Sequence, residues 1–216
     1  MSEDFKKLRK KMVKTQLIRR GIENEKVIEA FKKVAREEFV DPKYQHSSYN
    51  DSPLPIDKDQ TISQPYIVAY MIEKLALKEN DRVLEIGTGS GYAAAILAEI
   101  VAEVYTIERF ETLAGKAAER FEKLDYNNIE VKIGDGSLGW EEYAPYDGIV
   151  VSAAAPYVPE KLKEQLAENG KIIIPIGEKK GVQQLKLITK IKEDNFKEES
   201  LDYVRFVPLT GEDGWS

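Results

Sequence analysis

The chain has 216 residues and a formal net charge of −6, with 42% hydrophobic and 32% charged residues, a composition typical of one globular domain. It contains no cysteine, which excludes disulfides, thiol nucleophiles, cysteine-ligated zinc and iron–sulfur clusters. Its one histidine, His46, excludes a multi-histidine metal site and leaves any Ser-His-Asp hydrolase dependent on that residue. We therefore expect no metal centre, and chemistry that needs neither a thiol nor a histidine.

The N-terminal segment is predicted to form two short helices within residues 4–35. Apolar residues recur at helical spacing up to Gly21, which ends the first helix, and Asn24 caps the second. Residues 1–36 carry 12 Lys/Arg and 5 Asp/Glu, a net +7, whereas the rest of the chain carries −13. We interpret this charge as the solvated face of a helix pair, with a nucleic-acid-binding arm as the alternative.

Residues 40–65 are predicted to form an ordered loop. Four prolines interrupt regular structure there, while tyrosine, leucine and isoleucine side chains supply apolar anchors. Loops of this length inside compact domains are often functional, so we expect this one to belong to a site.

From Ile67 onward, helical and strand patterns alternate. The predicted helices lie at 67–77, 92–101, 113–124 and 159–166, and the predicted strands lie at 82–86, 103–108, 129–133, 146–152, 171–176, 182–191 and 201–207. This alternation predicts an α/β fold with a doubly wound, mainly parallel sheet. We expect one domain over 1–216, with helices and a loop at 1–65 and the α/β core with its C-terminal strands at 66–216.

A glycine-rich loop with the sequence GTGSG lies at Gly87–Gly91, between a predicted strand and a predicted helix. In such folds ligands bind beyond the carboxyl ends of the strands, where glycine lets the backbone approach and a helix N-terminus favours an anion. Tyr92 replaces the third glycine of the dinucleotide fingerprint, and Glu85 precedes the loop. The pattern resembles motif I of the S-adenosylmethionine-dependent methyltransferases, with a simple tight turn as the alternative.

Two further acidic residues follow the next two predicted strands. Glu108 lies 23 residues after Glu85, where a carboxylate can accept hydrogen bonds from ribose hydroxyls. Asp135 lies between two glycines, which leaves its carboxylate free to accept from an adenine amino group. A solvated strand end and a turn carboxylate explain each residue taken alone. Three such features in order predict an adenosine-containing cofactor.

Several longer segments match the sequence motifs of a single family: Asp51–Ile56, Gln60–Tyr66, Val104–Arg109, Gly134–Gly136, Ala144–Asp147, Ala153–Pro156, Phe206–Gly211 and Gly214–Trp215. With these segments the chain resembles the protein-L-isoaspartate (D-aspartate) O-methyltransferase family from about Val34 to its end. Thr61-Ile62-Ser63 is the most diagnostic part. The chain departs from the family at Asp57-Lys58-Asp59, where glycines are common, and at Asp125, a position that is commonly glycine.

The resemblance implies a Rossmann-like S-adenosylmethionine-dependent methyltransferase. Such an enzyme methylates the free carboxylate of an L-isoaspartyl or D-aspartyl residue in a damaged protein or peptide, and leaves S-adenosyl-L-homocysteine. The resemblance implies Ser63 as the catalytic residue, acting through hydrogen bonds and not as a nucleophile. The cofactor-binding residues that we expect are Thr61, Ile62, Glu85, Gly87, Thr88, Gly89, Glu108, Asp135, Gly136 and Thr210.

Two other functions stay open at this point. The same cofactor could serve methylation of RNA or a small molecule, which the basic first 36 residues favour, or the chain could bind an adenosine compound without catalysis. We expect a cytoplasmic monomer with isoaspartyl proteins as partners and with neither nucleic acid nor membrane. No stretch approaches the about 18 apolar residues of a membrane span.

Overall fold

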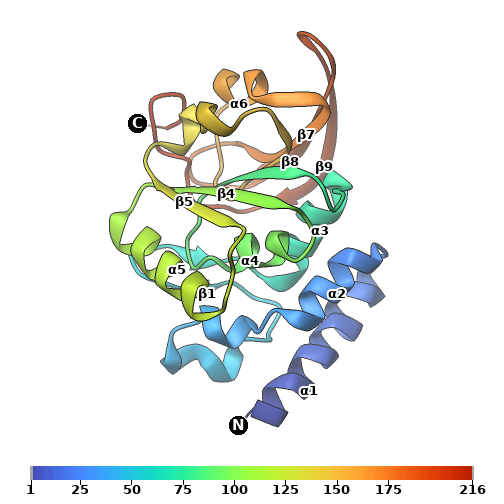
Figure 1. Cartoon of the computed structure of the whole chain (residues 1–216), viewed down its shortest axis with the longest axis vertical. Helices are drawn as coiled ribbons and strands as arrows, with labels where there is room; N and C mark the ends of the chain where they lie inside the picture. Colours follow the sequence, from blue (N-terminus) through green and yellow to red (C-terminus); the bar gives the residue numbers. More distant parts are fainter. Residues whose placement is uncertain (1, 216) are drawn as a thin grey trace.

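A computed structural model describes residues 2–215, which contain a seven-stranded sheet with helices on both faces (Figure 1). The strands are β3 (Arg82–Ile86), β4 (Glu103–Glu108), β5 (Ile129–Ile133), β6 (Tyr146–Val151), β7 (Leu166–Gly177), β8 (Gln183–Lys192) and β9 (Asn195–Val204). Their order across the sheet is β5-β4-β3-β6-β7-β8-β9. The pairs from β5 to β7 are parallel, and β8 and β9 are added antiparallel. The predicted doubly wound, mainly parallel sheet is therefore confirmed.

The strand order reverses between β3 and β6. From β3 the chain winds outward through β4 to β5, and then returns to pair β6 with the other side of β3. Such a switch point leaves a crevice at the carboxyl ends of the strands, because the connections on its two sides diverge.

Helices cover both faces of the sheet, because alternate strand residues point to two separate apolar clusters. The cluster that holds Val83, Val104 and Val150 faces α3 (Pro65–Leu75), α4 (Tyr92–Ala98) and α5 (Glu111–Lys123). The cluster that holds Leu84, Ile107 and Ile149 faces α6 (Glu160–Glu164) and the 3-10 turns η5 (Gly136–Leu138) and η6 (Glu141–Tyr143). Figure 1 shows α6 on one side of the sheet and α3, α4 and α5 on the other.

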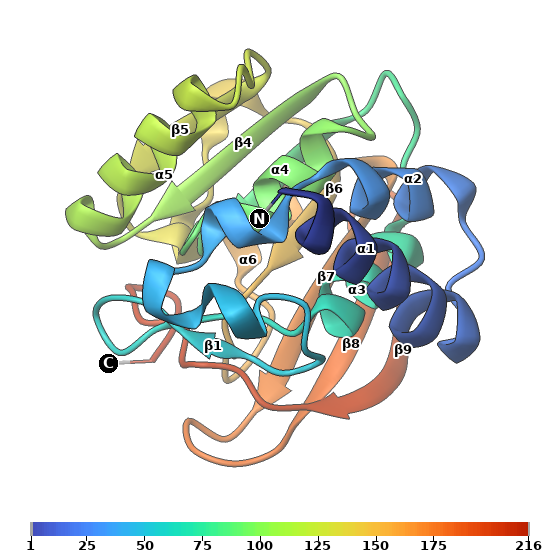
Figure 2. The ribbon, with the colours of Figure 1, turned by 90° about the horizontal axis from the view of Figure 1, so that it is seen from below.

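The N-terminal helices form an outer layer over α3 and α4 (Figure 2). Helix α1 (Ser2–Met12) continues through a π-helical turn, η1 (Val13–Leu17), and a 3-10 turn, η2 (Ile18–Arg20). Gly21 then adopts a left-handed φ of 90°, which confirms the predicted helix end. Helix α2 (Glu25–Lys33) begins at the predicted cap, where the Asn24 side chain accepts from the N–H groups of Lys26 and Val27 at 3.0 and 3.3 Å.

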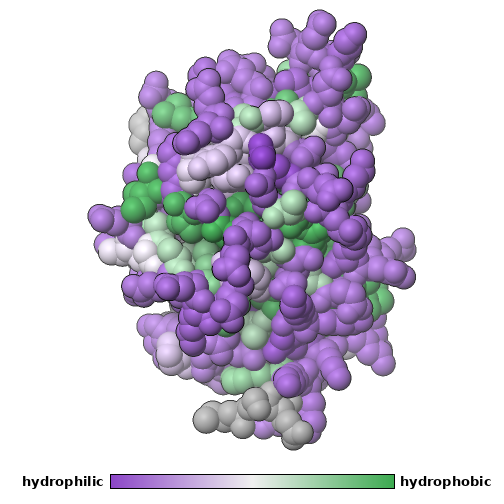
Figure 3. Space-filling view, in the orientation of Figure 1, coloured by the Kyte–Doolittle hydropathy of each residue, from purple (hydrophilic) through white to green (hydrophobic). Residues whose placement is uncertain are grey.

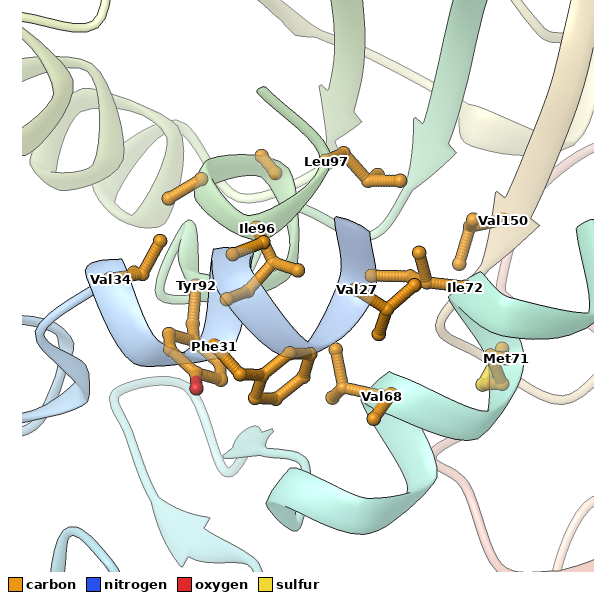
Figure 4. Packing of buried hydrophobic residues seen from close by; sticks show 14 of the residues in the cluster. Val27, Phe31, Val34, Val68, Met71, Ile72, Tyr92, Ile96, Leu97 and Val150 are labelled. Atoms are coloured by element: carbon orange, nitrogen blue, oxygen red, sulfur yellow. The ribbon is translucent and has the colours of Figure 1, made fainter. Parts of the chain in front are cut away.

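The outer layer is fixed by apolar side chains that Figure 4 shows at the contact of α2, α3 and α4. Phe31 of α2 is fully buried and meets the ring of Tyr92 edge-on at 5.9 Å between centroids. Val68 of α3 and Ile96 of α4 belong to the same cluster. The N-terminal helices therefore share one core with the sheet.

The predicted loop is ordered. It follows a 3-10 turn, η3 (Arg36–Phe39), and contains a second one, η4 (Pro42–Ser47), and a short antiparallel pair, β1 (Leu54–Pro55) with β2 (Thr61–Ile62). Its side chains Tyr49 and Leu54 are buried in the core, which explains why a proline-rich segment has one conformation. Figure 2 shows this segment beside the C-terminal segment.

Two predicted elements differ from the structure. The predicted helix 159–166 is shortened to α6, because Leu166 already pairs with Tyr146 as the first residue of β7. Asn169 and Gly170 lie in an irregular part of β7, where the register against β6 shifts and Asn169 has a φ of 63°. Strand β9 starts at Asn195 and not at 201, since its first half is exposed and polar and lacks the alternation that marks a strand.

The molecular surface is predominantly polar on the face drawn in Figure 3, where hydrophobic residues gather in a band across the middle. None of the helices within residues 2–215 is long and apolar enough to cross a membrane.

We expect Phe31→Ala to lower the free energy of unfolding by about 3–5 kcal/mol, because a fully buried ring is lost from the contact that joins the outer helices to α4. Urea denaturation followed by circular dichroism measures the change. Ile18→Ala removes a side chain that is 46% exposed in the same layer and should change stability by about 0.5 kcal/mol or less. Equal losses in the two variants would contradict this packing.

Candidate active site

A cleft opens at the carboxyl ends of β3, β4 and β6, at the switch point of the sheet. The empty space in it, including the part open to solvent, is about 840 Å³. Ten of the eleven residues predicted for the site line it: Thr61, Ile62, Ser63, Glu85, Gly87, Thr88, Gly89, Glu108, Gly136 and Thr210. The tertiary fold thus brings together the loop of β1 and β2, the glycine loop, and the C-terminal segment.

The glycine loop adopts backbone dihedral angles that are unfavourable for residues with a side chain. Gly87, Gly89 and Gly91 have φ values of 93°, 52° and 85°, in the left-handed region. The N–H of Gly87 donates to the carbonyl of Ile107 at 2.9 Å, which ties the loop to the end of β4. At Gly91 a Cβ would also lie 2.6 Å from the Phe121 ring. The loop is therefore rigid, and it turns the chain directly from β3 into α4.

Glu85 is a fully buried carboxyl group in the wall of the cleft. The Thr106 hydroxyl donates to its Oε2 at 2.6 Å, and the hydroxyl of Thr88 lies 2.6 Å from that of Thr106. Within residues 2–215 no group hydrogen-bonds its Oε1. Burial raises the pKa of Glu85 to about 8. The hydrogen bond from Thr106 lowers this pKa, and the nearby Glu108 carboxylate raises it. An unmet acceptor of this kind suits a ligand that brings a positive charge or a donor.

Glu108 ends β4 and is 5% exposed, with both carboxylate oxygens held by backbone donors. The N–H of Gly89 donates to Oε2 at 2.9 Å, and the N–H of Phe110 donates to Oε1 at 3.0 Å. Each oxygen has a second lone pair, so the carboxylate is oriented and can still accept from a diol. This geometry fits the predicted contact with ribose hydroxyls.

Asp135 is the one predicted residue that does not line the cleft. Its Oδ1 accepts from the N–H and the hydroxyl of Ser137 at 2.9 and 2.7 Å, and its Oδ2 accepts from the N–H of Glu212 at 2.6 Å. Burial opposes ionisation, but these hydrogen bonds outweigh it and the pKa of Asp135 lies below its ordinary value. In this structure Asp135 holds the C-terminal segment that closes the cleft, and its contact with adenine stays a prediction.

Ser63 lies where the cleft meets a second cavity, the groove. The groove is lined by Arg20, Pro53, Thr61, Ser63, Gln64, Tyr66, Ile67, Ser152, Val182 and the consecutive residues 202–207. Ser63 and Ser152 line both cavities. No hydrogen bond engages the Ser63 hydroxyl within residues 2–215, so it is available to a ligand.

The two cavities contain different ionisable groups. The cleft contains the Glu108 carboxylate and Arg109 beside Glu85 with its raised pKa, whereas the groove contains Arg20, which is paired with Asp51, together with Arg205 and Asp202. Ligands bound in the two cavities would meet at Ser63 and Ser152.

Sequence reasoning missed Ser152 and the wall formed by Val207, Pro208 and Leu209. Ser152 directly follows β6, so the strand-end rule that identified Glu108 could have found it. The wall carries no chemical signal of its own, because only the parallel bridge between Pro208 and Ala154 brings it to the cleft. His46 lies exposed in η4 and lines neither cavity.

Within residues 2–215, no group of three or more His, Asp or Glu side chains is arranged to hold a metal ion.

Comparisons with known proteins agree with this geometry. The sequence profile described as protein-L-isoaspartate(D-aspartate) O-methyltransferase matches residues 7–214. The chain is 55% identical over 213 residues to protein-L-isoaspartate O-methyltransferase of Petrotoga mobilis, covering 98% of this chain and 100% of that protein. It is 54% identical over 204 residues to protein-L-isoaspartate O-methyltransferase 2 of Pelobacter propionicus, covering 94% of this chain and 91% of the relative.

Solved structures show the same likeness. A structure described as a Plasmodium falciparum protein-L-isoaspartate O-methyltransferase in complex with S-adenosyl-L-homocysteine has a TM-score of 0.80 at 30% identity, covering 95% of this chain and 98% of that one. A second structure, with the printed name protein-L-isoaspartate O-methyltransferase, has a TM-score of 0.87 at 30% identity and covers 95% of this chain and 67% of that one.

The buried Glu85 makes stability depend on pH. The pKa of Glu85 is about 8 in the folded protein and near 4.5 when exposed. The stability that Glu85 contributes to the folded state is therefore fully present below pH 4.5 and is lost as the pH rises to 8. We expect Glu85→Gln to gain a few kcal/mol in unfolding free energy relative to the wild type between pH 5 and 9, since each pKa unit corresponds to about 1.4 kcal/mol.

Urea titrations at several pH values measure this difference without ligand. The exposed Glu168→Gln is the matched control and should follow the wild type at every pH. A constant difference between Glu85→Gln and the wild type would show that Glu85 is ionised throughout.

Proposed function

The chain belongs to the protein-L-isoaspartate(D-aspartate) O-methyltransferase family, and we propose that its cleft and groove carry out that reaction together. The enzyme transfers a methyl group from S-adenosyl-L-methionine to the free carboxylate of an L-isoaspartyl or D-aspartyl residue in a damaged protein or peptide. The product of the donor is S-adenosyl-L-homocysteine. The observation that carries the proposal is that the cleft with the glycine loop and Glu108 meets a second cavity at Ser63.

The residues of the cleft fit the donor. When bound, S-adenosylmethionine supplies a methyl group on a positively charged sulfonium. The Glu108 carboxylate makes the cleft attractive to a cation, and the Oε1 of Glu85 has a hydrogen-bond site to fill. We assign the ribose to Glu108, whose two oxygens are held in place by Gly89 and Phe110. Gly87, Thr88 and Gly89 bring the backbone close to the amino-acid end of the donor.

The C-terminal wall completes the donor pocket. Gly136 lies against Ile86, where a Cβ would be 2.4 Å from the isoleucine Cγ2, so only glycine allows this close approach. Thr210 lines the cleft on the segment that Asp135 anchors through Glu212. We propose that Thr61, Ile62 and Thr210 contact the donor from the side opposite the glycine loop.

The acceptor needs no base. An aspartyl or isoaspartyl carboxylate has an unperturbed pKa of about 4 and is already ionised at neutral pH. Its attack on a methyl sulfonium releases a neutral thioether, so no acid is required either. What remains for the protein is to hold two reactants of opposite charge in line, which can supply several kcal/mol. The lack of a histidine at the site agrees with this chemistry.

We propose that Ser63 orients the acceptor carboxylate with its free hydroxyl. A single neutral donor suits this task, because the two reactant charges cancel in the transition state and a strongly bound carboxylate would react more slowly. Ser152 lies on the same boundary and can give a second donor. The methyl ester then closes to a succinimide, which partly hydrolyses to normal aspartate, so the reaction repairs the damage.

We further propose, from the sequence, that residues 1–216 act as one domain, as a monomer, in the cytoplasm and without a nucleic-acid partner. Burial of Phe31 and Val27 in the core of the sheet supports the first point, because it removes the apolar side of the N-terminal helices from solvent. Methylation of RNA or of a small molecule is kept as an outcome of the test below.

We expect the protein to methylate an isoaspartyl peptide and to leave the same peptide with normal aspartate unmodified. Transfer from labelled S-adenosylmethionine measures both. Equal labelling of the two peptides, or labelling of RNA without peptide, would contradict the proposal.

We expect Ser63→Ala to lower kcat/KM for the isoaspartyl peptide about two- to tenfold, since one lost hydrogen bond is worth about 0.5–1.5 kcal/mol. His46→Ala serves as the control and should keep turnover nearly intact, because His46 is exposed and lines neither cavity. Donor binding, measured by calorimetry, should remain in both variants. Unchanged kcat/KM in Ser63→Ala would refute its role.

A further inference from the structure

The groove extends beyond the reacting carboxylate. Its lining comes from Arg20, from Thr61, Ser63, Gln64, Tyr66 and Ile67, and from residues 202–207 with Val182. Only Thr61, Ser63, Ser152 and Val207 are shared with the cleft. The rest of the groove lies away from the donor and can contact only the residues that flank the isoaspartyl residue.

Arg20 is already engaged inside the protein. Its guanidinium forms an ion pair with Asp51 and lies over the ring of Tyr66, 3.4 Å from the centroid. Asp51 in turn accepts from the N–H of Tyr66 at 3.3 Å. This arrangement builds the wall of the groove and leaves the charge of Arg20 balanced.

Asp202 is also engaged, because it lies against the hydroxyl of Tyr70. Burial and then the Asp202 carboxylate raise the pKa of that hydroxyl. Tyr70 stacks on Tyr66, with 5.8 Å between ring centroids, so Asp202 is connected to the same wall.

Arg205 is different, since no hydrogen bond or ion pair within residues 2–215 engages its guanidinium. It is exposed and follows the last residue of β9. Its neighbour Tyr203 is 74% exposed, and Val182 on the adjacent strand end is 49% exposed. A peptide in the groove would therefore find a free cation beside an apolar surface.

Resting on the proposed function, we propose that Arg205 makes the enzyme select isoaspartyl sites that have an acidic residue next to them. The carboxylate of a flanking Asp or Glu binds the guanidinium of Arg205 while the isoaspartyl carboxylate lies at Ser63. Arg205 acts on recognition alone, because it lines the groove and is absent from the cleft.

The test compares isoaspartyl peptides that differ in one flanking residue, which is Gln, Glu or Lys, placed before or after the isoaspartyl residue. We expect the wild type to favour Glu over Gln by about two- to fivefold in kcat/KM at one of these positions, mostly through KM, as for an exposed ion pair. The preference should weaken as sodium chloride is raised.

Charge variants of Arg205 then show whether this residue causes the preference for Glu over Gln. Arg205→Gln should bring the Glu/Gln ratio close to one, Arg205→Lys should retain most of it, and Arg205→Glu should favour Lys. Arg19→Gln, an equal change of charge at an exposed residue outside the groove, should leave the ratio as in the wild type.

A Glu/Gln ratio that is the same in Arg205→Gln and the wild type, or a wild type without preference, would overturn the inference. The peptide with a flanking Gln distinguishes a failure of the Arg205 inference from a failure of the proposed function. If that peptide is methylated and its aspartyl twin is not, the proposed function holds whatever Arg205 does. If no isoaspartyl peptide is methylated, the proposed function has failed.

Discussion

The reversal of strand order between β3 and β6 is the constraint on which the site depends. It opens a crevice at the carboxyl ends of the strands, where Glu85, Glu108 and Ser152 all arrive from neighbouring strands. The glycine loop fits only there, because its left-handed residues turn the chain into α4 without filling the space above β3. The loop of β1 and β2 and the C-terminal segment then close the crevice from outside.

The two cavities are built from different parts of the chain. The cleft is formed largely by strand ends and the glycine loop, whereas Arg20 and Arg205 of the groove come from η2 and from the residue after β9. Two ionic reactants can thus be bound in adjacent cavities and brought into contact at a boundary whose polar side chains, those of Thr61, Ser63 and Ser152, are all hydroxyls. The protein needs no titrating side chain at that boundary, because the acceptor is already charged and the leaving group is neutral.

The N-terminal helices have two tasks in this arrangement. Their apolar side covers α3 and α4, and Arg20 at the end of η2 supports the groove by stacking on Tyr66. Their basic charge, which suggested nucleic acid as an alternative, lies partly in internal contacts: Arg9 donates to the Tyr49 hydroxyl and to the carbonyl of Lys33, and Arg36 is fully buried.

Much of the fold was predictable from the sequence, because strand alternation, Gly21 and Asn24 are local signals that act over a few residues. The same is true of Glu85 and Glu108, whose place at strand ends fixes where they lie once the sheet forms. Asp135 was placed correctly in its turn, yet only the folded chain decides that its oxygens accept from Ser137 and Glu212. The placement of Ser63 and Val207 along the same two cavities, and the guanidinium of Arg205 that no group within residues 2–215 engages, likewise depend on tertiary structure. Ser63 and Val207 are more than 130 positions apart, and such proximity is set by sheet closure and packing, which no local pattern records.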